Sequence, residues 1–423
     1  MILGLLMEGK VCAQTPALPF PQHSVYVAGF LPDTVNRAQM DDAVRDFFKA
    51  WSARYLKRSP DGKGYYVSIR GEAKAEDCVS EAMGYGMMAL VLMSDSAIDQ
   101  RNHALFDGLF HFYRAHPSRR DRPGTYQKVS SILMASAQKR NGQIMQDVDK
   151  TSASDGDIDI GFALLLAERQ WGSAGRVHYR EEAVRIIDSI FAQEIDTVRY
   201  TIVQSNAIES DGSPDFHDFR TSDFIPSELK AFGEVCRDPR WNRVVDSNYA
   251  RLAGLRDAYS PSRHLLADFY KRVGESYVPG RRRKDEIFPD AYYYNACRLP
   301  WRIGLDYLMS GDERSRRLLE PLNQWIIDTT QGDPARINAG YSLKAGGMRG
   351  PEIDTLMLSF IAPLGVSAMA DRAYGHWLNK IWALTVSAPL IPSGRFRAQE
   401  YGYYENTIKL LCMIVMSGNY WSP

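Results

Sequence analysis

Apolar residues recur at helical spacing along almost the whole sequence, and this periodicity most constrains the fold. No low-complexity linker interrupts it, so we expect one domain over residues 20–423. Helices bury their apolar stripes against one another. A dozen helices in one domain favour an all-α (α/α)6 toroid of six helical hairpins, with long loops forming a cleft at one end. An irregular all-α domain is the alternative.

About twelve helices are predicted, at 40–57, 80–94, 100–115, 159–171, 180–193, 227–237, 241–260, 297–309, 313–331, 351–366, 371–384 and 405–417. Short strands are predicted within 64–70 and 199–204.

Charge and cysteine content exclude several function classes. The 51 basic and 51 acidic residues give zero net charge, which argues against a nucleic-acid or membrane-surface binder. No apolar run reaches the roughly 18 residues of a membrane span. The five cysteines and eight histidines are scattered without metal-ligand spacing. We therefore expect neither a metal nor a cofactor.

The N-terminal segment, residues 1–19, has some features of a secretory leader. Val11-Cys12-Ala13 fits a cleavage site, but the preceding apolar run is short and is interrupted by Glu8 and Lys10. A truncated signal peptide would explain this pattern. We therefore expect a secreted or periplasmic protein.

The segment 78–93, CVSEAMGYGMMALVLM, places an acid at the start of an apolar helix. Gly84 and Gly86 weaken a helix by roughly 1 kcal/mol each, so they suggest that something approaches the backbone closely. A partly desolvated Glu81 could serve as a general acid. It could equally be a helix-capping residue that favours the N-terminal dipole.

The segment 153–172, ASDGDIDIGFALLLAERQWG, carries three alternating aspartates before an apolar helix. A calcium loop is excluded because the EF-hand glycine and distal glutamate are missing. Asp155, Asp157 and Asp159 are either an N-cap cluster or carboxylates that face the cleft. Several acids, many aromatic residues and no metal are typical of glycoside hydrolysis.

Two motifs give the sequence a resemblance to glycoside hydrolase family 8, the inverting endo-glycanases with an (α/α)6 fold. Residues 80–86, SEAMGYG, match the pattern Ser-Glu-x-x-Gly-Tyr-Gly, whose glutamate is the general acid in that family. Residues 153–161, ASDGDIDIG, match the family signature except for a final glycine in place of alanine. The resemblance thus assigns Glu81 as the acid and Asp155 as the aspartate that holds the distorted sugar, with Asp157 as the fallback.

The segment 285–304, DEIFPDAYYYNACRLPWRIG, departs from the family at its usual base. Many members have aspartate where this chain has Asn295. The chain resembles a branch, known for chitosanases and some β-glucanases, in which a glutamate just upstream is the base. Glu286 is the closest match, and Asp285 and Asp290 are the alternatives. A solvated acid on a basic loop is the other interpretation of Glu286.

The remaining substrate contacts are expected at one arginine and several aromatic side chains. Arg298 can orient acids or substrate through its planar guanidinium. The candidates for the wall of the sugar cleft are Tyr85, Tyr294, Trp301, Tyr403 and Tyr404, and core packing is the alternative for each. Ser136 stands where the family often has a tryptophan, so one distal subsite is in doubt.

The expected activity is inverting endo-hydrolysis of a β-1,4-linked polysaccharide. Chitosan leads because of Asn295; cellulose or mixed-linkage β-glucan is the alternative, and xylan ranks third. A toroid that binds sugar without turnover is the alternative from another class. Polysaccharide is the one expected partner, and we expect a monomer.

Overall fold

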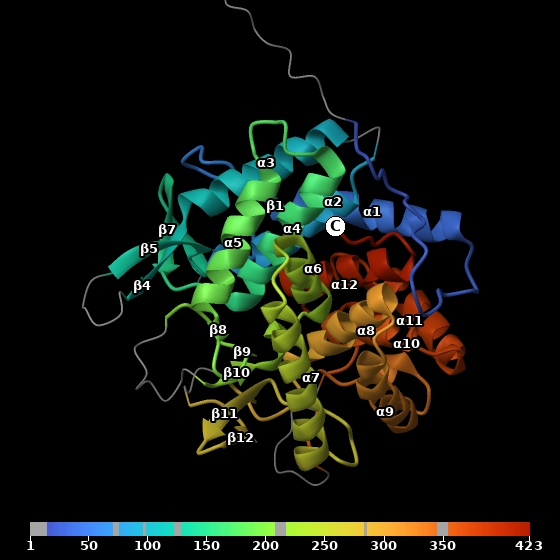
Figure 1. The fold of residues 1–423 in the computed structure, drawn as a ribbon. Helices are drawn as coiled ribbons and strands as arrows, with labels where there is room; N and C mark the ends of the chain where they lie inside the picture. The colour runs from blue at the N-terminus through green and yellow to red at the C-terminus, as the bar shows by residue number, and fades with distance from the viewer. Residues whose placement is uncertain are drawn as a thin grey trace, which may run out of the picture.

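The architecture is a ring of helices with small sheets in its loops. The computed structural model describes residues 15–70, 76–95, 99–121, 128–207, 217–282, 286–344 and 354–423. These ranges contain twelve α-helices and five small antiparallel sheets. Figure 1 shows blue α1, Arg37–Tyr55, beside red α12, Tyr403–Met416. The predicted all-α toroid is confirmed.

Six helices form the inner ring. Each contacts the next around a closed circle, in the order α2, α4, α6, α8, α10, α12 and back to α2. Most of their residues are buried, as expected for helices that are surrounded by others, and α6 is the exception with four buried residues. Their bounds are α2 Ser80–Leu92, α4 Ser154–Trp171, α6 Pro226–Cys236, α8 Leu299–Ser310, α10 Leu358–Ala368 and α12 Tyr403–Met416.

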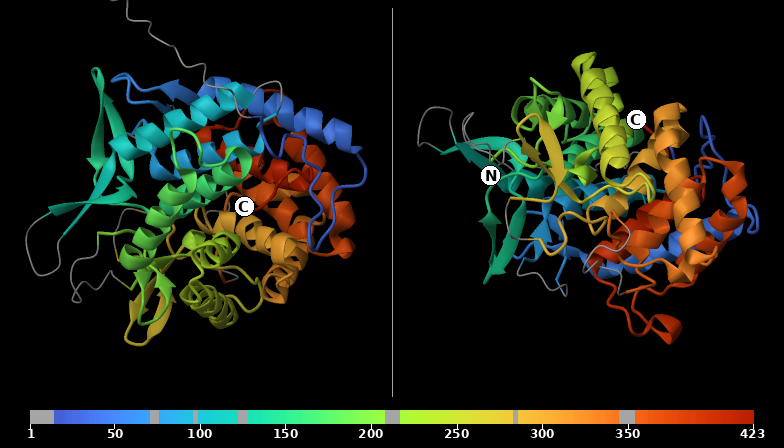
Figure 2. Two further views of the ribbon diagram at one scale, coloured as in Figure 1. Left: turned by 45° about the horizontal axis from the view of Figure 1, so that its top comes forward. Right: turned by 90° about the horizontal axis from the view of Figure 1, so that it is seen from below.

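The other six helices pack outside this ring, each against a sequence neighbour or, for α1, against α12. Their apolar stripes face inward and their charged faces point to solvent, as in α9, where Leu319 and Ile326 are buried. Figure 2 shows these helices around the periphery. Their bounds are α1 Arg37–Tyr55, α3 Asp99–Ala115, α5 Tyr179–Gln193, α7 Arg240–Tyr259, α9 Glu313–Thr330 and α11 Gly375–Ser387.

Two predicted helix starts differ from the structure by five residues or more. The fourth helix begins at Ser154 instead of residue 159, because acidic residues are favourable near a helix N-terminus and need not lie in a loop. The tenth begins at Leu358 instead of 351, and residues 351–353 lie outside the described ranges. None of the helices in the described ranges is long and apolar enough to cross a membrane.

Short strands occupy the loops at the N-terminal end of the inner ring. For example, β3 runs directly into α2, and β10 leads through the 3-10 helix Thr221–Asp223 into α6. Strands fall within both predicted segments, as β2 and β9, whereas the hairpins β4–β5, β6–β7 and β11–β12 were not foreseen. The bounds are β1 Leu56–Arg58, β2 Tyr65–Val67, β3 Cys78–Val79, β4 Pro117–Asp121, β5 Lys128–Met134, β6 Ala137–Asn141, β7 Ile144–Asp149, β8 Ile195–Asp196, β9 Thr201–Ile202, β10 Phe219–Arg220, β11 Phe269–Val273 and β12 Ser276–Pro279.

The opposite end of the ring is crossed by the N-terminal segment. Backbone N–H groups of this segment bond to carbonyls at the C-terminal ends of α4, α12, α8 and α10. The bonds are Ala17 to Gln170 at 3.0 Å, Ser24 to Gly418 at 2.7 Å, Val27 to Leu308 at 2.9 Å and Phe30 to Met369 at 3.1 Å. This end is therefore covered, and the end that carries the strands is left for a site. The predicted leader lies largely outside the described residues, which begin at residue 15.

Candidate active site at the N-terminal end of the inner helices

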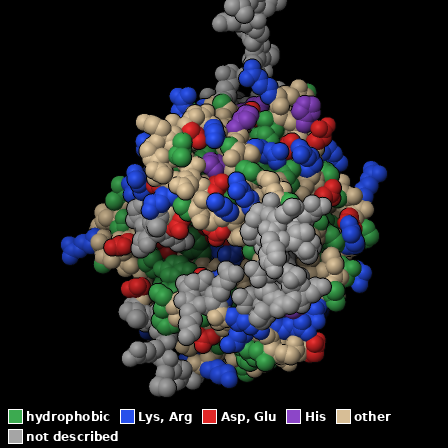
Figure 3. Space-filling view, turned by 90° about the vertical axis from the view of Figure 1, so that its left-hand side faces the viewer, with side chains coloured by type: hydrophobic (Ala, Val, Ile, Leu, Met, Phe, Trp, Pro, Cys, Tyr) green, Lys and Arg blue, Asp and Glu red, His purple; other side chains and the backbone are tan. Residues whose placement is uncertain are grey.

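Glu81 is the one residue of α2 that is not buried. Strand β3 ends at Val79 and the helix starts at Ser80, so Glu81 sits in the first turn at the strand-bearing end. Its side chain is 17% exposed, while the rest of the helix is enclosed by the ring. Figure 3 views the molecule from the side where most strands lie, and a hollow is visible between hydrophobic and charged side chains.

Two glycines let α2 and α4 approach closely at this end. A Cβ on Gly84 would lie 2.5 Å from the Cβ of Asp159, and a Cβ on Gly156 would lie 2.7 Å from the backbone nitrogen of Glu81. The expected close approach to the Gly84 backbone is therefore made by a neighbouring helix. Glycine at both positions brings Glu81 and Asp155 to the same point.

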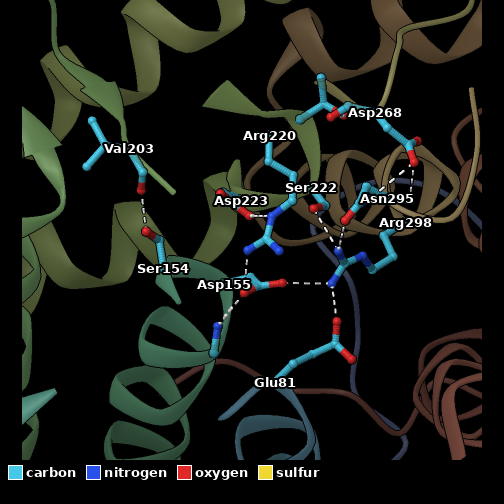
Figure 4. Close-up of polar contacts among 12 residues, drawn as sticks. Glu81, Ser154, Asp155, Val203, Arg220, Ser222, Asp223, Asp268, Asn295 and Arg298 are labelled. Carbon is cyan, nitrogen blue, oxygen red and sulfur yellow. Dashed lines mark hydrogen bonds and ion pairs between the residues drawn. The ribbon is translucent and has the colours of Figure 1, made fainter. Parts of the chain in front are cut away.

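Arg298 joins these two acids. One of its terminal nitrogens, Nη1, lies 2.6 Å from Glu81 Oε2 and 2.9 Å from Asp155 Oδ2. The other, Nη2, donates to Ser222 Oγ at 2.7 Å and Asn295 Oδ1 at 3.0 Å. The Arg298 side chain is only 2% exposed, and Figure 4 shows it at the centre of the polar contacts. Its planar guanidinium holds four groups from different elements in one arrangement.

Asp155 also forms an ion pair with a second arginine, Arg220. Its Oδ1 accepts from Arg220 Nη2 at 2.7 Å and from the backbone N–H of Gly156 at 3.0 Å. Burial alone would raise the pKa of Asp155, but the two guanidiniums outweigh it and lower the pKa to about 2. Asp155 is therefore a carboxylate at any physiological pH. Arg220 also contacts Asp223 at 2.7 Å, and burial raises the pKa of Asp223 to about 7.

Asn295 is tied to a buried carboxylate. Asp268, directly before β11, accepts hydrogen bonds from the Asn295 side chain at 3.1 Å and from the backbone N–H groups of Tyr293, Asn295 and Ala296 at 2.7–3.0 Å. Burial outweighs these bonds and raises the pKa of Asp268 to about 6. Asn295 thus contacts Arg298 and Asp268, and has no proton to exchange at neutral pH.

The candidate bases lie on the segment just before Asn295. Glu286 is 38% exposed and forms a 3.4 Å ion pair with Arg281. Burial raises the pKa of Tyr293, and the carboxylates of Asp268, Asp354 and Glu286 raise it further. Asp290 is exposed, and Asp285 lies outside the described residues.

The predicted aromatic wall is only partly at the surface. Tyr85 and Trp301 are buried, Tyr85 bonding Arg298 through its hydroxyl at 3.2 Å and Trp301 stacking on the Arg302 guanidinium at 4.0 Å. The prediction that Tyr85 and Trp301 line the sugar cleft was therefore wrong, because the inner helices enclose both aromatic side chains. Tyr403 is also buried, although its hydroxyl is 3.4 Å from Glu81 Oε1. Tyr294 and Tyr404 are half-buried, and the Tyr404 hydroxyl donates to the Tyr294 carbonyl.

Asp157, the fallback sugar contact, lies inside the fold. Its Oδ1 accepts from the backbone N–H of Met134 at 2.9 Å, and the residue is fully buried. Burial raises its pKa to about 8. The prediction that Asp157 contacts substrate therefore does not fit its position, because the side chain holds β5 against α4.

Sequence reasoning missed four residues around Arg298 and Asp155, namely Arg220, Ser222, Asp223 and Asp268. Arg220, Ser222 and Asp223 come from the short elements before α6. Asp268 carried one usable signal, since it is a lone acid between apolar residues in LLADFY. A buried acid in such a run requires polar partners.

Similar proteins support these observations. The family model of "Glycosyl hydrolases family 8" matches residues 46–418. The chain is 37% identical to the "Beta-glucanase" of Niallia circulans over 99% of its length and 95% of the relative's. It is 29% identical to an "Endoglucanase" of Bacillus sp. (strain KSM-330), covering 96% of this chain and 82% of that one. Its fold superposes on a solved β-1,3-1,4-glucanase from Paenibacillus sp. X4 with a TM-score of 0.84 and 36% identity, covering 97% of this chain and all of the other.

Proposed function

The chain belongs to glycosyl hydrolase family 8 and is a glycoside hydrolase, and from this premise we propose that it is an inverting endo-glucanase. The observation that carries the proposal is the partly exposed Glu81 beside Arg298 and Asp155, at the end of the ring that the N-terminal segment leaves open. Family membership sets aside a toroid that binds sugar without turnover.

The proposed substrate is mixed-linkage β-glucan or cellulose. The relatives named above are glucanases, which favours this alternative over chitosan, the first choice from the sequence. A further argument is net charge. With 51 basic and 51 acidic residues the chain has no excess negative charge to attract a polycation such as chitosan, whereas a neutral glucan needs none.

In the proposed mechanism Glu81 protonates the glycosidic oxygen while a water attacks the anomeric carbon from the opposite face. Arg298 orients Glu81, and the Asp155 carboxylate accepts hydrogen bonds from the ring that distorts. Glu286 activates the water. Inversion requires the two reacting carboxyl groups to stand about 6.5–9.5 Å apart in the substrate complex.

A polysaccharide is too large to cross a membrane, so we propose that the protein acts outside the cytoplasm. The possible cleavage site at Val11-Cys12-Ala13 fits this. A monomer stays a prediction, which the elution volume of the purified protein on a size-exclusion column checks.

The substrate proposal is tested by release of reducing sugar from barley β-glucan, carboxymethylcellulose, soluble chitosan and xylan, compared at equal mass. We expect the fastest hydrolysis on one of the two glucans. A faster rate on chitosan would restore the first choice from the sequence. Proton NMR of the first product should show the α-anomer, whereas an initial β-anomer would contradict inversion.

The base is tested by a matched pair of variants on the same segment. Glu286→Gln should lower kcat by about 10²–10⁴-fold, because a glutamine cannot remove a proton from water. Asp290→Asn is the control and should stay near the wild-type rate. If Asp290→Asn loses the activity and Glu286→Gln keeps it, the assignment moves to Asp290. If both keep it, Asp285 becomes the candidate.

A further inference from the structure

Asp268 has an unusually complete set of hydrogen-bond partners. Its Oδ1 accepts from the backbone N–H groups of Tyr293 and Ala296 at 2.8 and 2.7 Å. Its Oδ2 accepts from the backbone N–H and the side-chain Nδ2 of Asn295 at 3.0 and 3.1 Å. The residue is 2% exposed, and four donors of the chain occupy its two oxygens. These contacts give Asp268 a holding role on the segment that leads to Arg298.

The four bonds fix which way the Asn295 amide points. An ionised carboxylate can only accept and a guanidinium can only donate. The Asn295 NH₂ must therefore face Asp268, and its carbonyl oxygen must face Arg298 Nη2, 3.0 Å away. Figure 4 shows this line of contacts running from Asp268 through Asn295 and Arg298 to Glu81.

We propose that Asp268 is a positioning residue for the reaction: through the oriented amide of Asn295 it sets the Arg298 guanidinium and, through that, the proton-donating Glu81. The inference rests on the proposed role of Glu81. In this arrangement Asn295 has a function of its own, which is to link Asp268 to Arg298, although it cannot act as a base. An aspartate at 295 would put a second carboxylate about 3 Å from Asp268, a distance at which two carboxylates cannot both ionise.

The proposal predicts a defect in proton donation, which a leaving group of low basicity does not need. Asp268→Asn puts an NH₂ group against the Asn295 NH₂, so the Asn295 amide must turn and its own NH₂ then faces Arg298. We expect kcat on β-glucan to fall about 100-fold with KM changed less than about threefold. On a 2,4-dinitrophenyl β-cellotrioside, whose phenolate departs without a proton, the loss should stay below about tenfold.

A second variant covers the case in which Asp268→Asn does not fold. Asn295→Ala leaves the three backbone donors of Asp268 in place and removes only the link to Arg298. It should show the same difference between the two substrates. The double variant Asp268→Asn with Asn295→Asp restores a donor facing an acceptor at each step. An aspartate at 295 could also act as a base and would then speed both substrates alike, so the test is the ratio: the double variant should restore the wild-type ratio of kcat on the two substrates.

The matched control is Asp306→Asn. Asp306 is also fully buried and accepts from Lys230 at 2.7 Å and Tyr249 at 2.6 Å, but it lies toward the far end of α8. Its substitution should lower the melting temperature and leave the ratio of the two substrates unchanged. Equal losses on both substrates in Asp268→Asn and Asn295→Ala, or an unrestored ratio in the double variant, would overturn the proposal. A wild-type enzyme that cleaves neither substrate would instead refute the proposed function.

Discussion

Arg298 and Arg302 lie one helical turn apart, and each joins two acidic side chains. Arg298 contacts Glu81 and Asp155, while Arg302 contacts Asp159 at 2.7 Å and Glu228 at 3.3 Å. The first group reaches the strand-bearing end of the ring, with Glu81 partly exposed. The second is enclosed, and all three of its side chains are 0% exposed.

The two arginine-centred groups differ in burial and in the number of arginines, and the pKa values of their carboxyl groups therefore differ. Asp155 has two arginines, which lower its pKa to about 2 against the effect of burial. Asp159 shares one arginine with Glu228, so burial dominates and raises the pKa of Asp159 to about 6. Burial and the neighbouring Asp159 likewise raise the pKa of Glu228. The enclosed group holds the inner helices together, whereas the outer group keeps charged side chains within reach of a substrate.

The largest difference is expected between Glu81→Gln and Glu228→Gln. Glu81→Gln should lower kcat on β-glucan about 10³-fold or more, because the amide cannot protonate the leaving oxygen. Glu228→Gln should keep kcat within about threefold. The comparison fails if the two variants lose activity equally. Circular dichroism of both proteins checks that the fold survives.

Arg302→Met should mainly affect stability. Removing one partner of a buried ion pair costs about 3–5 kcal/mol because a charge is left unpaired. We expect the free energy of unfolding in urea to fall by that amount, while kcat measured on the remaining folded protein stays within about fivefold. Arg298→Met is the matched variant, and its kcat should fall at least a hundredfold. A catalytic loss in Arg302→Met as large as in Arg298→Met would contradict the division between the two groups.

The ring was predictable from the sequence because apolar residues recur at helical spacing along nearly all of its helices. The hairpins β4–β5 and β6–β7 were not, because their residues show no clear alternation of polar and apolar side chains. The same contrast holds at the site. Glu81 and Asp155 lie in specific local motifs, whereas the contacts of Asp268 with Asn295 and of Arg220 with Asp155 join distant segments. Such contacts exist only after the chain has folded.

The burial of Tyr85 and Trp301 shows a second limit of the sequence. An aromatic residue beside a catalytic motif has the same local pattern whether it faces a sugar or a neighbouring helix. Trp301 packs edge-to-face on Tyr85, with ring centroids 5.7 Å apart, inside the ring. Which aromatic faces stay open depends on how the six inner helices close the ring, and that is decided by contacts between distant segments.

The two groups should also respond to pH with opposite signs. A carboxyl group whose pKa is raised by folding stabilises the fold at pH values below its pKa in the unfolded chain, near 4. This stabilisation is lost as pH rises through the pKa in the folded protein, which is about 6 for Asp159. The pKa of Asp155 is lowered to about 2 by folding. Its contribution to the free energy of unfolding is therefore present above pH 4 and is lost as pH falls through 2.

Urea unfolding from pH 2 to 8 tests these signs. Glu228→Gln removes one acid of the enclosed group, so the decline in the free energy of unfolding with rising pH should be shallower than in wild type. Asp155→Asn should be less stable than wild type at pH 7, and its deficit should shrink toward pH 3. Parallel pH profiles for wild type and both variants would show that neither group titrates as inferred.

The smallest effect is expected from the hydroxyl of Tyr404, which donates to the Tyr294 carbonyl beside Arg298. A single hydrogen bond contributes about 1 kcal/mol, so Tyr404→Phe should lower kcat/KM about fivefold by loosening the segment before Asn295. Trp301→Phe is the counterpart beside Arg302 and should lower the melting temperature with little change in kcat/KM. If Tyr404→Phe instead lowers only the melting temperature, Tyr404 has a structural role alone. It would then not differ from Trp301 in the way inferred here.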